Sequence, residues 1–303
     1  MPVNRAWRRG FDPSMSIFQF PKTALAVTGA VCALVATLVA SPSVAAAERT
    51  AFRVCADPNY LPYSNRAGEG FENRIAVMLA DDLGLPVEFT WFPQRMGFIR
   101  NTLRAEREGG GHKCDVVMGV PDDFELTITT KPYYRSTYAL VYVKGRGLDD
   151  VETIDDLLNM ERSRLEKVRF GLAERNPGTV WLASHGMLDQ LVVAYASQLG
   201  DPGIQPGELE QRDLLEGRID ATIMWGPIAG HFVSRGKDTK IKMIPMRSEP
   251  GLKLDFAISA GVRFGEGAWK NELEALLTRN ASRIEKLLRE YNVPLVSEGG
   301  APL

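Results

Sequence analysis

Residues 52–91 read FRVCADPNYLPYSNRAGEGFENRIAVMLADDLGLPVEFTW, and this stretch decides the fold class. Phe52–Ala56 is a short apolar run that predicts a strand, and the turn residues Asp57-Pro58-Asn59 end it. Phe71–Leu83 predicts a helix, because its apolar residues recur at helical spacing and Gly84 follows them. Val87–Trp91 predicts a second strand. A strand, a helix and a strand in succession indicate a parallel sheet covered by helices.

Further elements extend this pattern into two successive α/β sets. The first set continues with a helix at Phe98–Ala105 and strands at Cys114–Gly119 and Tyr138–Val143, and Thr153 is expected to cap a helix. The second set has strands at Val168–Ala173, Ala221–Met224, Ile241–Met246 and Phe256–Val262, and helices at Thr179–His185, Gly207–Glu216, Pro227–Ser234 and about Ala268–Tyr291. Two such sets indicate two lobes, with a ligand cleft at the carboxyl ends of the strands and hinge closure around the ligand.

The first 47 residues have the layout of a secretory signal peptide. Four Lys or Arg residues precede a mostly apolar, uncharged run over residues 23–40, and Ala45-Ala46-Ala47 provides a small-residue cleavage site. The alternative is an uncleaved membrane anchor, because the run is about long enough to cross a bilayer. The cleavage site favours removal, which predicts a periplasmic mature chain with no stable membrane insertion. Met1 and Met15 both remain as starts, and the general export route is favoured over the twin-arginine route.

Composition excludes several classes of partner. Hydrophobic residues make up 45% of the chain and charged residues 24%, so a core of normal size is available. The formal net charge is −2, which gives no basic field for nucleic acid or an anionic membrane. Four of the 36 basic and one of the 38 acidic residues lie in residues 1–47, so the exported chain has a formal charge of −5. That charge suits a basic partner.

Export also predicts a disulfide between Cys55 and Cys114, the two cysteines that remain after cleavage. This bond would close a loop of about 60 residues and contribute about 4 kcal/mol in the loop-entropy model. The alternative is a pair of buried free thiols. His112, His185 and His231 have no metal-ligand spacing, so no metal site is predicted.

Five segments, in order, resemble the type II periplasmic solute-binding proteins. Phe52–Ser64 resembles the first strand and mouth loop of that family, and Gly70-Phe71-Glu72 resembles the start of its first helix. Cys114–Gly119 resembles its third strand, Lys131–Tyr134 its Pro-Tyr step before the crossover, and Glu216–Ala221 its Gly-x-x-Asp-Ala motif in the second lobe.

The resemblance implies an α/β fold with two lobes, each a mixed, mainly parallel sheet flanked by helices. The first lobe is expected to comprise residues 51–143 and 247–303. The second lobe, residues 147–246, is expected to be inserted between them, with hinge segments near 143–147 and 246–250.

A narrower set of segments resembles binding-protein homologues of the MxaJ and XoxJ type, which are associated with methanol dehydrogenases. These segments are GEGFENRIA (68–76), WFPQR (91–95), FIRNTL (98–103) and PYYRSTY (132–138). This resemblance implies a periplasmic accessory of a pyrroloquinoline-quinone-dependent methanol dehydrogenase, with the lanthanide type favoured and its cytochrome c as a further partner. The quinone and the metal would belong to the dehydrogenase, so the chain itself is expected to carry no cofactor.

Amino-acid binders of this fold hold a zwitterion between an arginine and an acid. The arginine lies nine residues before the proline of the Pro-Tyr step, and the acid five residues after the aspartate of the Asp-Ala motif. In this chain those positions are Asp123 and Trp225. Arg135 lies beyond the step and replaces the arginine only if the loop is rearranged. Unpaired buried charges cost several kcal/mol each, so ordinary amino-acid uptake is not expected.

The residues expected at the cleft are mainly aromatic, which suits an apolar ligand, a flat ring or a protruding loop of a partner. The aromatic candidates are Tyr60, Tyr63, Phe92, Tyr133, Tyr134, Trp181 and Trp225. The polar candidates are Asp57, Glu72, Arg95, Asp123, Arg135 and Thr179, the last at a helix start that could hold an anion. The alternatives are core packing for the aromatic residues and helix caps or surface ion pairs for the polar ones.

Three functions follow from these patterns. We favour an interaction protein that docks on the dehydrogenase. The second is the solute receptor of an ABC uptake transporter for a small apolar or aromatic ligand. The third is an enzyme, since dehydratases of this fold need one positioned carboxylate and Glu72 or Asp123 could supply it. No catalytic motif supports that role, so the chain is not expected to be an enzyme.

Overall fold

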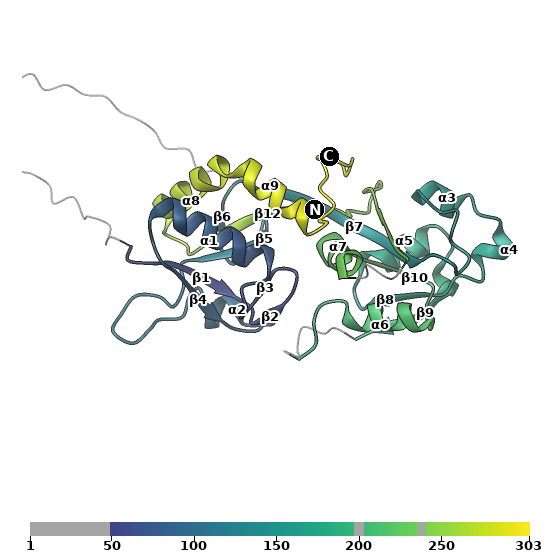
Figure 1. Cartoon of the computed structure of the whole chain (residues 1–303), viewed down its shortest axis with the longest axis horizontal. Coiled ribbons are helices and arrows are strands. Elements are labelled where there is room, and N and C mark those ends of the chain that lie inside the picture. The colour runs from purple at the N-terminus through teal and green to yellow at the C-terminus, as the bar shows by residue number, and fades with distance from the viewer. Residues whose placement is uncertain (1–48, 197–202, 236–239) are drawn as a thin grey trace, which may run out of the picture. The chain divides into compact units, whose positions relative to one another are not determined.

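The computed structural model describes residues 49–196, 203–235 and 240–303 (Figure 1). The predicted signal peptide lies outside these ranges. Every helix within them is too short or too polar to span a bilayer.

The first sheet is built on β1 (Phe52–Ala56). This strand pairs in parallel with β4 (Val87–Trp91) on one side and with β5 (Val116–Pro121) on the other. Strand β12 (Asp255–Val262) then runs antiparallel to β5 and to the short β6 (Ile128–Thr129). We call this sheet and its helices the first lobe. The sheet is therefore mixed, as predicted.

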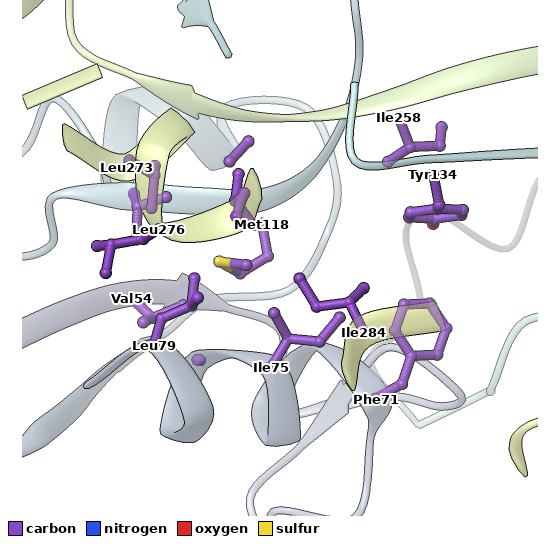
Figure 2. Close-up of a cluster of buried hydrophobic side chains, with 14 of the residues drawn as sticks. Val54, Phe71, Ile75, Leu79, Met118, Tyr134, Ile258, Leu273, Leu276 and Ile284 are labelled. Carbon is purple, nitrogen blue, oxygen red and sulfur yellow. The ribbon is translucent and has the colours of Figure 1, made fainter. Parts of the chain in front are cut away.

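Helix α1 (Phe71–Leu83) carries the apolar face that the spacing predicts. Figure 2 shows its Phe71, Ile75 and Leu79 directed at the sheet and at the C-terminal helices α8 (Gly267–Arg279) and α9 (Ala281–Glu290). The other first-lobe elements are α2 (Phe98–Asn101) and the hairpin of β2 (Asn59–Tyr60) and β3 (Ser64–Asn65). At Gly70 a Cβ atom would overlap the Tyr63 carbonyl, so the helix can begin directly against this hairpin loop.

Strand β7 (Tyr134–Val143) belongs to both sheets. Residues 134–137 pair with β12, and residues 138–143 pair with β10 (Ala221–Trp225) on one side and β11 (Ile241–Pro245) on the other. Beyond β10, the parallel strands β8 (Phe170–Ala173) and β9 (Leu191–Tyr195) complete the second sheet. The second lobe consists of this sheet with α3 (Ile154–Leu158), α4 (Arg162–Leu165), α5 (Pro177–Ser184), the 3₁₀ helix η1 (Leu188–Gln190), α6 (Glu208–Glu216) and α7 (Gly226–Arg235).

The bounds of β1, α1 and β4 are those predicted, and Thr153 caps α3 with its hydroxyl on the Asp156 N–H at 3.1 Å. Two predicted elements differ from the structure by four residues at one end. The helix expected to reach Ala105 ends at Asn101, because Ala105 accepts a hydrogen bond from Lys113 in a hairpin instead. Strand β7 begins four residues early. Strand β9 was not predicted at all.

The long helix expected at the C-terminus is two helices that meet at Asn280. This residue is 1% exposed, and its side-chain amide donates to Asp82 Oδ2 at 2.7 Å and to the Leu276 carbonyl at 3.0 Å. The Leu276 carbonyl therefore accepts both the side-chain amide and the backbone N–H of Asn280, the latter at 3.1 Å, where the two helices meet.

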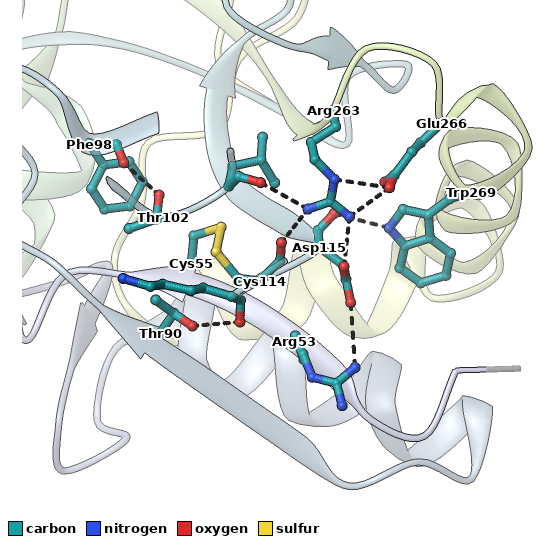
Figure 3. The surroundings of a disulfide bond; sticks show 12 residues. Arg53, Cys55, Thr90, Phe98, Thr102, Cys114, Asp115, Arg263, Glu266 and Trp269 are labelled. Atoms are coloured by element: carbon teal, nitrogen blue, oxygen red, sulfur yellow. Dashed lines mark hydrogen bonds and ion pairs between the residues drawn. A yellow bond between two sulfur atoms is a disulfide. The ribbon is translucent and has the colours of Figure 1, made fainter. Parts of the chain in front are cut away.

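Cys55 and Cys114 form the predicted disulfide, with Cα atoms 5.3 Å apart. Figure 3 shows it beside a buried charge network in which Arg263 donates to Asp115 at 2.7 Å and to Glu266 at 2.6 Å. The remaining Arg263 bonds go to the carbonyls of Leu103 and Cys114. These contacts fix the segment that leads into β5, beneath the loops that follow β1 and β4.

Replacing both Cys55 and Cys114 with serine should lower the free energy of unfolding by about 4 kcal/mol, because the unfolded chain regains the freedom of the closed loop. Urea unfolding of residues 48–303 measures this difference. A reducing agent should shift the wild-type transition and leave that of the double variant in place. A loss below about 1 kcal/mol would contradict this account of the disulfide.

Candidate functional site

A cleft between the lobes consists of two adjoining cavities of about 370 and 300 Å³. Their shared wall is formed by Asp57, Tyr60, Tyr63, Gln94, Tyr138 and Trp225. The larger cavity also takes residues from α6, α7 and the loop before α5. The smaller cavity is lined mainly by the first lobe, from β1, α1, β5 and β12. The ends of both sheets therefore supply the lining.

Aromatic rings make up much of this wall. Tyr60 stacks on Tyr63 with ring centroids 5.1 Å apart. Trp225 ends β10 directly opposite Tyr138 of β7, and its ring lies 5.4 Å from Tyr138 and 5.8 Å from Phe256. The three rings meet where β7 passes from one sheet to the other.

Asp57 is buried and already bonded. Its Oδ1 atom accepts the Asn59 backbone N–H at 2.7 Å, and its Oδ2 atom accepts the backbone N–H of Gln94. The carboxylate therefore joins the loop after β1 to the loop after β4. Both loops line the cleft. Asp57 therefore positions these loops, and its carboxylate oxygens are already hydrogen-bonded.

Glu72 differs from Asp57 because no hydrogen-bond or ion-pair partner for its carboxylate exists among the described residues. It occupies the first turn of α1 and lines the smaller cavity. Its Oε1 atom lies against Gly119 of β5, where any Cβ atom would overlap it. Burial raises the pKa of Glu72 to about 8.

Four tyrosines lie close enough to Glu72 for its charge to raise their pKa values further above those set by burial. They are Tyr60, Tyr63, Tyr133 and Tyr134. The carboxylate thus sits in an aromatic, poorly hydrated part of the cleft.

The second lobe adds Glu174, Arg175 and Glu210 to the larger cavity. Arg175 is exposed and adopts a φ of 60°, in the left-handed region. Across the cleft, Gln205 Nε2 donates to Asn59 Oδ1 at 3.2 Å. Asp57, Glu72, Glu174 and Glu210 give the described lining four carboxyl groups against a single basic side chain, Arg175.

Six of the predicted residues line the cleft: Asp57, Tyr60, Tyr63, Glu72, Tyr134 and Trp225. Two further aromatic candidates, Phe92 and Tyr133, are not part of the lining. Phe92 packs against the core around the disulfide, and Tyr133 donates its hydroxyl to the Met118 carbonyl at 2.9 Å. Arg95 is exposed, with its guanidinium 5.6 Å from the Phe92 ring centroid.

The remaining predictions need correction. Trp181 is 1% exposed in the second-lobe core, and its Nε1–H donates to Glu249 at 2.7 Å. Thr179 lies in the first turn of α5, outside the cleft lining. Asp123 is exposed, and neither cavity includes it. Arg135 is held by Asp255 at 2.7 Å, so it does not replace the missing clamp arginine.

Sequence reasoning missed Tyr138, Gln94, Arg175 and Phe256. A signal existed for Tyr138. Tyr134 and Tyr138 are an even number of residues apart, so a strand that starts at Tyr134 places both on one face. Gln94 and Arg175 lie in loops, whose path the residue pattern does not determine.

These features define a type II periplasmic binding protein. No family model matches the chain. MoxJ of Methylorubrum extorquens is 30% identical over 258 residues, which cover 80% of this chain and 81% of MoxJ. The chain therefore belongs to the MoxJ, MxaJ and XoxJ family of periplasmic binding proteins, which is a non-enzymatic family.

Solved structures agree with this assignment. The periplasmic binding protein XoxJ from Methylobacterium extorquens AM1 is 35% identical, with a TM-score of 0.62 over 81% of this chain and 99% of XoxJ. MxaJ from Methlophaga aminisulfidivorans MPT is 25% identical, with a TM-score of 0.65 over 81% of this chain and all of MxaJ (100%). An ancestral cationic amino-acid solute-binding protein, 18% identical with a TM-score of 0.59, shares the fold.

The contribution of Glu72 to the stability of the chain should fall as the pH rises from about 4.5 towards about 8, because the folded state holds the Glu72 proton that the unfolded state releases. Within this window Glu72 lowers the free energy of unfolding by about 1.4 kcal/mol for each unit of pH, and Glu72→Gln removes this pH dependence. Urea unfolding at pH 5 and pH 8 compares the two chains. Asp81→Asn, an exposed change on the same helix, serves as control. Parallel pH profiles for wild type and Glu72→Gln would rule out a raised pKa.

Proposed function

We propose that this chain is a periplasmic accessory protein that assists a pyrroloquinoline-quinone-dependent methanol dehydrogenase by binding a segment of its partner in the cleft. The observation that supports this proposal is an aromatic cleft without the arginine and acid that hold a zwitterion in amino-acid binders. Trp225 stands at one clamp position, and Asp123 at the other lies outside the lining.

Family membership supports the link to methanol oxidation. The chain is 35% identical to XoxJ and 25% identical to MxaJ, each over about four fifths of its length (81%). We therefore propose the XoxJ type, and with it a dehydrogenase of the lanthanide-dependent kind, with the cytochrome c of that enzyme as a further partner.

The cleft wall has the character of a protein-binding surface. Trp225, Tyr138 and Phe256 present three rings in mutual edge contact. Large aromatic residues in a pocket dominate the affinity of many protein interfaces, because they bury much apolar area and lose little side-chain entropy. A protruding loop of the partner fits such a pocket.

Periplasmic location is part of the proposal. It rests on the signal-peptide layout of residues 1–47 and on the periplasmic relatives. An oxidising compartment also suits the disulfide between Cys55 and Cys114.

A solute receptor for an uptake transporter is the second candidate. Cavities of about 370 and 300 Å³ fall in the range of small-molecule sites, so the cleft has room for a free apolar or aromatic ligand.

Affinity-tagged residues 48–303 should retain the quinoprotein dehydrogenase, identified by mass spectrometry, from periplasm of cells grown under conditions that induce it. Trp225→Ala should weaken binding to the purified dehydrogenase at least tenfold, because truncating a buried aromatic anchor typically costs 2 kcal/mol or more (on the order of 30-fold). Surface plasmon resonance measures this loss.

Trp91→Ala is the matched control. Trp91 is half-buried like Trp225 but stacks on Phe89 at the end of β4, outside the cleft lining. Failure to retain any quinoprotein, or equal losses from the two tryptophan variants, would count against docking through the cleft. A transition raised by a small apolar solute, with no quinoprotein retained, would favour the receptor instead.

A further inference from the structure

We infer that the cleft binds an alkylammonium group, with the Glu72 carboxylate as its ionic partner and the surrounding tyrosines as its wall. This inference rests on the proposed use of the cleft and names the chemistry of its occupant. The ammonium can belong to a free small amine or to a lysine side chain of the partner, because both present the same group.

The charge of the lining selects a cation. Four carboxyl groups face the two cavities, and Arg175, in the larger cavity, is the single basic side chain among the described lining residues. A cleft lined by one sign of charge concentrates ligands of the opposite sign, because its low-dielectric walls focus the field. An anionic ligand meets repulsion in the smaller cavity, whose described lining holds Asp57 and Glu72 and no base.

Of the two carboxyl groups in the smaller cavity, Glu72 is the one without a hydrogen-bond partner among the described residues. Asp57 is bonded to two backbone N–H groups, whereas Glu72 has no bond partner among the described residues. An unpaired carboxylate in a poorly hydrated site costs free energy, and a cation beside it recovers much of that cost. A ligand that supplies the missing charge is therefore bound more tightly than a neutral ligand of the same shape.

The walls around Glu72 also favour a cation. Tyr60, Tyr63 and Tyr134 line the same cavity, as do Trp225 and Phe256. Aromatic faces attract cations through the negative charge of their π surface, and this attraction grows when water is excluded. The ring cluster accommodates the alkyl stem of the ligand, while Glu72 accepts hydrogen bonds from its ammonium.

Gly119 makes this geometry possible. Any side chain at this position of β5 would occupy the space of the Glu72 Oε1 atom. The missing side chain thereby lets the carboxylate lie close to the strand. Gly119→Ala consequently perturbs the site while Glu72 itself is retained.

Isothermal titration calorimetry of residues 48–303 at pH 8 tests the inference with n-butylammonium, 1-butanol and butyrate. We expect n-butylammonium to bind at least tenfold more tightly than 1-butanol, and butyrate to give no binding. Glu72→Gln and Gly119→Ala should each weaken n-butylammonium at least tenfold, while Asp81→Asn leaves it unchanged. Circular dichroism verifies that each variant is folded.

The pH dependence gives an independent readout. Glu72 must lose its proton to pair with the ligand, so affinity should rise about tenfold per pH unit from pH 6 to 7.5 and level off above about pH 8. Asp57, Tyr60, Tyr63, Tyr133, Tyr134 and Tyr138 are the other titratable groups around Glu72 among the described residues. The tyrosines titrate above this window, since burial raises their pKa values, and the bonded Asp57 is retained in all variants.

N-acetyl-lysine-N-methylamide distinguishes the two sources of the ammonium. Tighter binding than n-butylammonium identifies a lysine side chain of a protein partner, and weaker binding identifies a free amine; both support the inference. Equal affinities for 1-butanol and n-butylammonium, or no effect of Glu72→Gln, would overturn it. Retention of the quinoprotein is measured separately, so loss of ammonium binding alone rejects only this inference, and loss of retention alone rejects only the proposed function.

Discussion

Strand β7 makes hydrogen bonds to β12 through residues 134–137 and to β10 and β11 through residues 138–143. One backbone segment therefore holds both sheets in register. Tyr134 is the first residue of β7, and Tyr138 is the residue at which β7 changes its partner from β12 to β10. The aromatic wall of the cleft therefore lies where the two sheets join. The C-terminal segment braces the same place, since Ser136 donates to the Pro294 carbonyl at 2.8 Å.

Two carboxyl groups in this cleft behave differently because their partners differ. Asp57 accepts hydrogen bonds from backbone N–H groups of two loops, so its carboxylate already has partners and connects those loops. Glu72 lies among tyrosines against Gly119, and burial acts on it without compensation. This contrast is the basis of the proposed preference of the cleft for an ammonium group.

Much of the first lobe was predictable, because the apolar spacing of Phe71–Leu83 and the turn after Phe52–Ala56 are local signals. The disulfide was predictable from cysteine count and export. Strand β9 and the early start of β7 were not, because pairing with distant strands, rather than local pattern, makes them extended. Trp181 was misplaced for a similar reason: the local sequence predicts its helix, but its burial depends on the distant core residues that it contacts. Gln94 and Arg175 depend on loop paths that only the folded chain specifies.

Burial leaves the Glu72 carboxyl poorly solvated, and the proposed ammonium ligand supplies the opposite charge that it lacks. Titration of its side-chain carbon signal by ¹³C NMR, assigned by comparison with Glu72→Gln, tests this claim most directly. The account predicts an apparent pKa of about 8 in the free protein and a clear fall when n-butylammonium is added. An apparent pKa near the ordinary 4.5, unchanged by the amine, would contradict it.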